Sequence, residues 1–194
     1  MAKRVLLAGL LGGLILFVWE FVAHEALPLG EAGLKALPNE PAARAALKQA
    51  APDTGLYIFP APDLTPGMTR AQQQQAMQVM LDKIRTGPVG ILAIHPDGVP
   101  TPFAQQLATQ FATDVVAMLL AAALLARAAA SRGFGGRLLL VTLLGLLPSL
   151  RAGIPYWNWY GFPATYVAAQ ATVDVVGFFL GGLVLAWLVR PGDR

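Results

Sequence analysis

The chain has 194 residues, of which 56% are hydrophobic and only 13% are charged, and its mean hydropathy is +0.56. A soluble domain carries about a quarter charged residues, so this composition indicates a membrane protein and excludes a disordered or collagen-like chain. The absence of cysteine excludes disulfides, thiolate metal sites, iron–sulfur clusters and thiol nucleophiles. The net charge of +3 comes from basic residues in short membrane-flanking segments, which usually set topology, so we expect no nucleic-acid partner.

Four apolar runs predict four membrane spans, at residues 5–23, 107–126, 138–150 and 164–189. The first run is long enough to cross about 30 Å of hydrocarbon, and since no A-x-A cleavage site follows it, we expect an uncleaved anchor and not a signal peptide. The third run has only 13 residues. It can span only if Arg137 and Arg151 extend outward from its two ends to the membrane surfaces.

The basic residues predict the orientation of the spans, because positive charge accumulates on the cytoplasmic side. On one side lie seven basic residues and the single acid Asp193; the seven are Lys3, Arg4, Arg127, Arg132, Arg137, Arg190 and Arg194. Both termini are therefore expected in the cytoplasm of a bacterial cell, with the inner membrane as the location. The opposite side holds residues 24–106, expected in the periplasm, and a connection at residues 156–163. The aromatic rings of this connection and the four tryptophans (Trp19, Trp157, Trp159 and Trp187) are typical of anchoring at the membrane surface.

The insert after His24-Glu25 is polar and nearly neutral, with six Lys or Arg and six Asp or Glu residues. Its pattern predicts a helix at 40–50, a buried strand at 56–59, a helix at 70–85 capped by Thr69, and a second strand at 89–94. The order strand, helix, strand favours a parallel pair with a right-handed crossover, although an antiparallel pair stays open. One face of the second helix is apolar and expected to be buried; it comprises Met77, Met80, Leu81 and Ile84. So small a module buries a marginal core, which favours a docking role.

A turn in the insert, residues 95–98, contains a histidine and an aspartate at the end of a strand. The pair could bind a metal or form a catalytic dyad, but no serine or cysteine lies beside it. Proline followed by Asp-Gly is ordinary turn chemistry, so we interpret this segment as a turn.

Three acids lie inside the predicted spans: Glu20, Asp114 and Asp174. Each costs about 2.5 to 3.5 kcal/mol in hydrocarbon, so such residues normally face a bundle interior or a cavity. A glutamine precedes each aspartate by four residues, which places both on one helical face. The sequence therefore predicts a polar cluster in the outer half of the bundle, with Arg151 as its counter-charge; its members are Glu20, His24, Gln110, Asp114, Arg151, Gln170 and Asp174.

Small residues occupy the other half of the same helical faces. Two G-x-x-x-G spacings, which let helix backbones approach closely, predict tight packing at the inner end of the bundle; they are formed by Gly9, Gly13, Gly177 and Gly181.

Three interpretations of the polar cluster remain open. Its members can hold helices together through hydrogen bonds. They can bind a proton or a cation, because one arginine does not neutralise three carboxylates. Finally, Glu20, His24 and the two aspartates can bind a divalent metal, although the repeated Glu-x-x-His of dimetal oxidases is missing.

The fold class expected from these patterns is an all-α membrane protein, a bundle of four transmembrane helices with both termini inside and a small α/β insert. Its segments are residues 1–23 (first helix), 24–106 (insert) and 107–194 (remaining helices). We expect a non-enzymatic protein without a cofactor that serves as an accessory, assembly or sensing subunit of a larger membrane complex, in contact with the bilayer and with other membrane proteins or copies of itself. A proton- or cation-coupled transporter or channel component is the first alternative, and a metal-dependent membrane enzyme is the second.

Overall fold

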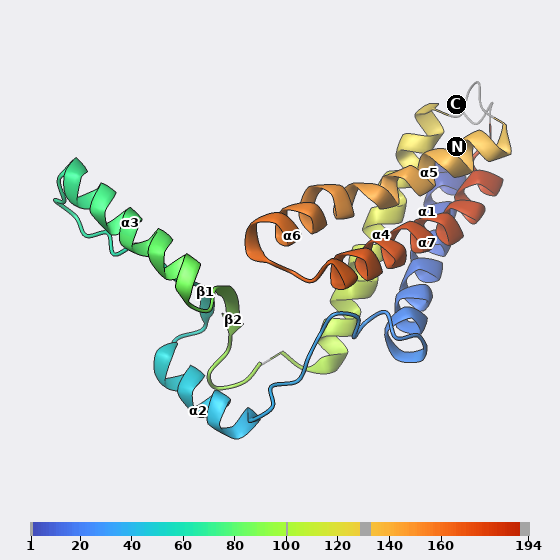
Figure 1. Ribbon diagram of the computed structural model, residues 1–194. Helices are drawn as coiled ribbons and strands as arrows, with labels where there is room; N and C mark the ends of the chain where they lie inside the picture. Colours follow the sequence, from blue (N-terminus) through green and yellow to red (C-terminus); the bar gives the residue numbers. More distant parts are fainter. Residues whose placement is uncertain (1, 100, 129–132, 191–194) are drawn as a thin grey trace. The chain divides into compact units, whose positions relative to one another are not determined.

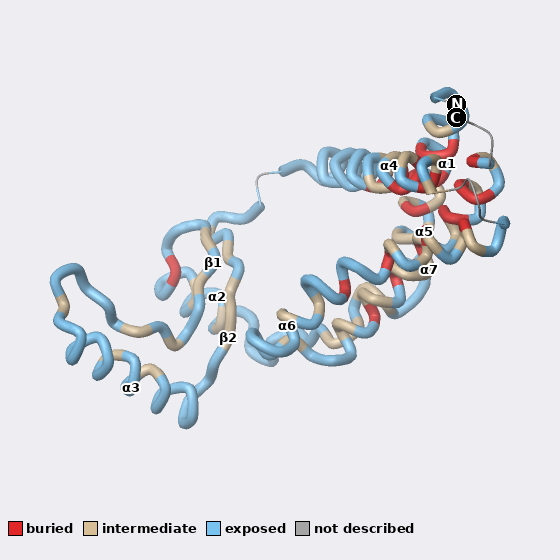
Figure 2. The backbone as a smooth tube through the Cα atoms, turned by 90° about the horizontal axis from the view of Figure 1, so that it is seen from above, coloured by how far each residue is buried: buried red, intermediate tan, exposed pale blue. Residues whose placement is uncertain are grey.

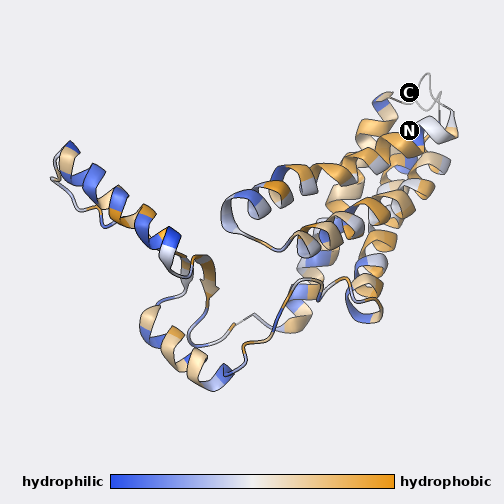
Figure 3. Cartoon of the chain, in the orientation of Figure 1, coloured by the Kyte–Doolittle hydropathy of each residue, from blue (hydrophilic) through white to orange (hydrophobic). Residues whose placement is uncertain are grey.

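A computed structural model of the chain describes residues 2–99, 101–128 and 133–190 (Figure 1). Four helices are long and apolar enough to cross a membrane, at Ala2–Ala26, Phe103–Ala128, Phe134–Tyr160 and Ala164–Leu188. Figure 3 shows that they are hydrophobic along most of their length, as expected of a multi-pass membrane protein. The chain divides into two compact units, which are described separately: Met1–Leu34 with Thr101–Arg194, and Lys35–Pro100.

The first unit contains the four long helices. Helix α1 (Ala2–Phe21) continues through a π-helical turn (Val22–Ala26). Helix α4 covers Phe103–Ala128 and helix α7 covers Ala164–Leu188. Helix α5 (Phe134–Pro148) continues through a second π-helical turn (Ser149–Gly153) into the short helix α6 (Ile154–Tyr160).

The third span is much longer than the predicted run of 13 residues. The prediction of residues 156–163 as a connection is also wrong for Tyr156–Tyr160, which are helical. The helix passes Pro148, which supplies no amide hydrogen, by widening into the π-helical turn that follows it. It ends only at Gly161, whose φ of 70° is left-handed and therefore suits glycine at the end of a helix.

In the bundle, α1 lies between α4 and α7, and α7 lies between α1 and α5. Buried apolar side chains from all four long helices form the core. The largest fully buried ones are Met118 and Leu125 of α4, Val141 of α5, Leu185 of α7 and Val189, which follows α7. Figure 2 shows the buried residues concentrated towards the end of the bundle where α1 begins and α7 ends.

Arg137 does not lie where the sequence predicts. It does not extend outward but is only 7% exposed, and its Nε and Nη2 atoms donate to the backbone oxygen of Ala186, at 3.0 and 2.9 Å. Carbonyls in the last turn of a helix have no partner within that helix. The guanidinium of α5 therefore caps the C-terminal end of α7, where a cation also interacts favourably with the helix dipole.

The second unit contains all four predicted elements: helix α2 (Glu40–Ala50), strand β1 (Gly55–Phe59), helix α3 (Arg70–Thr86) and strand β2 (Gly90–Ile94). Asn39 caps α2, since its side chain accepts from the amide of Ala42. Thr69 and Gln72 form a capping box at the start of α3. These caps explain why both helices begin where the sequence predicts.

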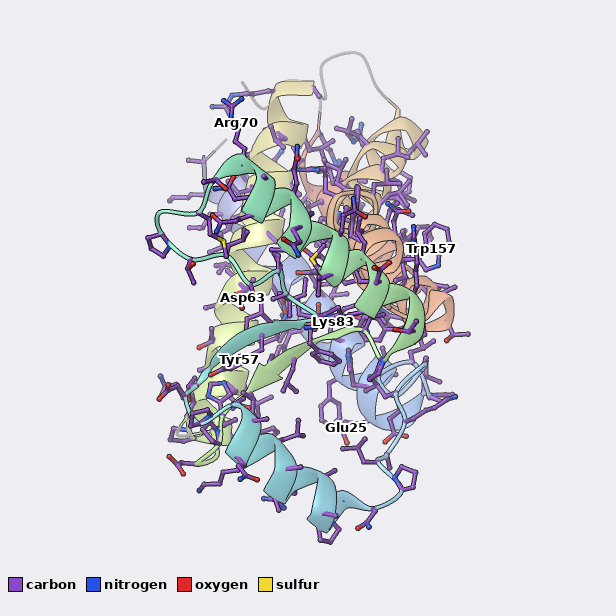
Figure 4. All side chains as sticks on the ribbon, turned by 60° about the vertical axis from the view of Figure 1, so that its left-hand side comes forward. Glu25, Tyr57, Asp63, Arg70, Lys83 and Trp157 are labelled. Atoms are coloured by element: carbon purple, nitrogen blue, oxygen red, sulfur yellow. The ribbon has the colours of Figure 1, made fainter. Side chains whose placement is uncertain are left out.

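The two strands pair antiparallel, with Leu56 opposite Ala93 and Ile58 opposite Ile91, so the prediction of a parallel pair is wrong. Ten residues, 60–69, lead away from β1 and can extend over at most about 35 Å. The 17 residues of α3 return over about 25 Å, so β2 begins where β1 ended. Figure 1 shows this outgoing segment beside α3, and Figure 4 shows Asp63 on the segment and Arg70 at the start of the helix.

The predicted burial of the apolar face of α3 is also wrong. Met77, Leu81 and Ile84 are 43%, 37% and 44% exposed. The outgoing segment packs beside α3 and leaves a groove of about 290 Å³, and Met80 is the one member of the predicted face that lines this groove and is partly buried. Among the described residues of this unit only Ala51 is buried, so no core forms to cover α3 or the strands, which were predicted to be buried.

Candidate intramembrane polar site

The centre of the site is a hydrogen-bonded chain that joins α1 to α4. Gln110 Nε2 donates to Glu20 Oε2 at 2.7 Å and to Asp114 Oδ1 at 2.9 Å. A primary amide has two N–H groups, and here each one serves a different carboxylate. Gln110 and Asp114 can share this contact because residues four apart lie on one face of a helix, as the sequence predicts.

Asp114 is the deepest member of this chain. The residue is 3% exposed, whereas Glu20 is half-buried and Gln110 is exposed. Its second oxygen, Oδ2, is buried and has no hydrogen-bond partner among the described residues. A buried polar atom without a partner costs about 1 to 3 kcal/mol, and more when it is charged, so its presence requires an explanation.

Asp174 has a different partner. Ser149 Oγ donates to Asp174 Oδ2 at 3.2 Å, from the buried first position of the π-helical turn after α5. The half-buried Gln170 side chain makes no hydrogen bond within the described ranges. The two similar Gln–Asp pairs therefore differ because the aspartate of α4 is bridged to α1, whereas that of α7 is bonded from the end of α5. Sequence reasoning missed Ser149; its signal is a polar residue beside a proline within an apolar run.

His24 and Arg151 lie at the edge of the site. The exposed His24 donates from Nδ1 to the backbone oxygen of Glu20 at 2.8 Å, and its ring lies against Gly30. Arg151 is exposed, and no ion pair joins it to a carboxylate in the described part of the chain. The structure thus brings Glu20, Gln110 and Asp114 together and leaves Arg151 apart from them.

A surface groove gives access to this chain. It has a volume of about 470 Å³ and lies between the end of α1 and the start of α4. Glu20, His24 and Gln110 line it together with four apolar side chains from the two helices. The polar groups of Glu20 and Gln110 are therefore reached from outside, whereas Asp114 does not line the groove.

Metal binding receives no support from this geometry. Within residues 2–99, 101–128 and 133–190, no group of three His, Asp or Glu side chains lies close enough together to hold a metal ion. Glu20 and Asp114 share an amide donor, and amide hydrogens do not coordinate metals.

Glycines and one indole hold the helices around the site. Gly9 and Gly13 lie against Leu119 and Val115 of α4, and an added Cβ would meet the Cα atoms of those residues at 2.8 and 2.5 Å. Gly177 similarly lies against Leu16 and Trp19 of α1, and Gly181 lies against Met118 of α4. The sequence also missed the contact made by the indole of Trp19, which was expected only to anchor at the membrane surface. Trp19 Nε1 donates to the backbone oxygen of Val173 at 2.9 Å and so links α1 to α7.

The site is an amide-bridged pair of carboxylates between two close-packed helices, with one carboxylate oxygen buried and without a hydrogen-bond partner among the described residues. No known protein family, curated protein or solved structure matches the chain.

Proposed function

We propose that this protein is a non-enzymatic accessory, assembly or sensing subunit of a larger membrane complex, and that its insert docks on another membrane protein. The supporting observation is an exposed apolar face of the two-stranded sheet. On this face Leu56 and Ile58 are 70% and 57% exposed, and the strand register places Ala93 and Ile91 beside them. An antiparallel sheet with one face in water usually carries polar side chains there, so an apolar face indicates a covered one.

The low stability expected of the isolated insert supports the same proposal. A two-stranded sheet is at best marginally stable in water, and this one gains no buried core from α2 or α3. A partner that covers the apolar face would stabilise the insert by about 25 cal/mol for each Å² of apolar surface removed from water. The insert therefore gains stability by docking.

Charge favours a protein partner over a lipid surface. After Glu25 the insert carries six basic and six acidic residues, which gives no net attraction to anionic lipid. Three ion pairs use half of its basic groups: Lys48 with Asp97 at 2.8 Å, and Arg44 with Glu40 and Arg85 with Asp82 at 3.4 Å. The partner surface that fits is therefore apolar and uncharged.

A pull-down from native membranes tests the docking proposal. The full chain with a C-terminal tag should retain a stoichiometric protein partner, and Ile58→Lys should reduce its recovery at least tenfold because a buried unpaired charge is costly. Gln74→Lys, on the exposed side of α3, adds the same charge and should retain the partner. A lone monomer in the wild type, or equal recovery with both variants, would contradict the proposal.

We also propose an orientation, with both termini in the cytoplasm of a bacterium and the insert in the periplasm. The support is that the described basic residues near the helix ends, except Arg151, lie at the start of α1 and α5 and at the end of α4 and α7, which this orientation places in the cytoplasm. Arg132 and Arg194 lie outside the described residues. Because the chain has no cysteine, single cysteines test this orientation. A membrane-impermeant thiol reagent should label Gln74→Cys in intact spheroplasts and Gly133→Cys only after lysis, and the reverse result would invert the topology.

A second function is favoured by one specific observation, the buried and unpartnered Oδ2 atom of Asp114. We propose as this alternative a small proton- or cation-coupled transporter or channel component that uses Glu20, Asp114 and Asp174. A proton bound on Oδ2 would remove the charge of a carboxylate that has no cationic partner among the described residues. In this alternative the groove at Glu20 would serve as the entrance on one side, and Gln110 would connect it to Asp114.

A further inference from the structure

A second groove lies at the opposite end of the α1–α4 pair, far along both helices from the polar site. Its volume is about 970 Å³, and it lies between the first residues of α1 and the last turns of α4. The floor is apolar, with Val5 and Leu6 from one helix and Leu119 and Ala123 from the other. The groove begins beside the close contact between Gly9 and Leu119, where the small side chains of α4 no longer fill the space.

Two cations, one from each helix, border this apolar floor. Lys3 comes from α1 and Arg127 from the last turn of α4. Arg127 Nη1 donates to the backbone oxygen of Ala123 at 3.3 Å, which engages one of the five N–H groups of a guanidinium. Among the residues that the structure describes, none that lines the groove is acidic. Two basic side chains at the end of a helical span lie at the depth of lipid headgroups.

We propose that this groove binds one anionic phospholipid, with an acyl chain along its floor and the phosphate between Lys3 and Arg127. The phosphate accepts hydrogen bonds from both side chains, and Arg127 can present two parallel N–H groups to it. A zwitterionic lipid carries its own cation, which repels the same two residues. An apolar helix of another protein would fill the floor but leave both cations without a partner, which is unfavourable.

Native mass spectrometry of the detergent-solubilised full chain tests this binding. Phosphatidylglycerol should bind with a stoichiometry of one and more tightly than phosphatidylcholine with the same acyl chains. Each basic residue near an anionic headgroup contributes about 1 kcal/mol, so Lys3→Gln and Arg127→Gln should each weaken phosphatidylglycerol binding about fivefold, and together about 25-fold. The control Arg151→Gln removes a cation from outside the groove and should leave binding unchanged.

A second variant changes the shape of the groove and keeps its charge. Ala123→Phe should fill the floor and weaken phosphatidylglycerol binding, whereas Leu120→Phe, at a position 62% exposed and outside the groove, should not. Thermal unfolding of each variant checks that it is folded; if Ala123→Phe fails this check, the charge variants alone decide. Equal binding of the two lipids by the wild type, or undiminished binding by the double charge variant, would overturn the proposal.

Discussion

Gly13→Ala should destabilise the helix bundle by about 1 to 3 kcal/mol, the usual cost of overpacking a filled interior. The added Cβ would lie 2.5 Å from the Cα atom of Val115. A side chain can rotate away from such a contact, but a backbone atom cannot, so α1 and α4 would have to separate. Separation would also lengthen the hydrogen bond from Gln110 to Glu20, which joins the same two helices.

Unfolding of the full chain in detergent, followed by circular dichroism, measures this effect. Gly135→Ala, in α5, is the matched control, because an added Cβ at this position meets no atom of the described residues within 4 Å. Alanine favours helix over glycine by up to about 1 kcal/mol, so this control should be neutral or more stable. If both variants unfold at the wild-type temperature, the close approach of α1 and α4 would be refuted.

Asp114→Asn should abolish ion flux if the transporter alternative is correct. Asparagine keeps the shape of the side chain, and its Oδ1 atom still accepts from Gln110, so the bridge to Glu20 is retained. It cannot take up a proton or hold a cation by charge at the position of Oδ2. The variant therefore separates the chemistry of the carboxylate from its role in packing.

Proteoliposomes that contain a pH-sensitive dye or a cation indicator measure the flux. Asp174→Asn should have the same effect, and Asp97→Asn, an exposed carboxylate of the insert whose side chain is 86% exposed, is the control. If the wild type shows no flux, or if Asp114→Asn conducts normally, the transporter alternative is excluded. Asp114 is then a residue that holds α4 in the bundle.

Local signals in the sequence predict much of this fold. The apolar runs locate the four long helices, and Asn39 and Thr69 locate the starts of α2 and α3, because a cap acts on amides within three residues of itself. The contact between Gln110 and Asp114 follows from helical spacing for the same reason. Each of these features depends on residues that are neighbours along one helix.

The features that the sequence did not predict depend on the path of the chain. The relative direction of the two strands depends on the connection between them. Residues 60–69 and α3 could cross over to give a parallel pair or run out and back to give an antiparallel pair, and the composition of this connection is compatible with both. Arginine is usually a surface residue, so the sequence does not predict that Arg137 is buried. The carbonyl oxygen of Ala186, which has no partner within α7, comes within hydrogen-bonding distance of Arg137 only when α5 packs on α7. The contact between Ser149 and Asp174 likewise joins residues 25 apart.

The central position of α1 has a consequence for how the protein is made. Gly9 and Gly13 lie against α4, while Gly12 lies against Leu185 near the end of α7. During synthesis α1 leaves the ribosome first of these helices, but it meets its second neighbour only after every other span has been translated. Until α7 is made, α1 packs against α4 alone, through Gly9 and Gly13, and a product that stalls before α7 leaves Gly12 without its contact to Leu185.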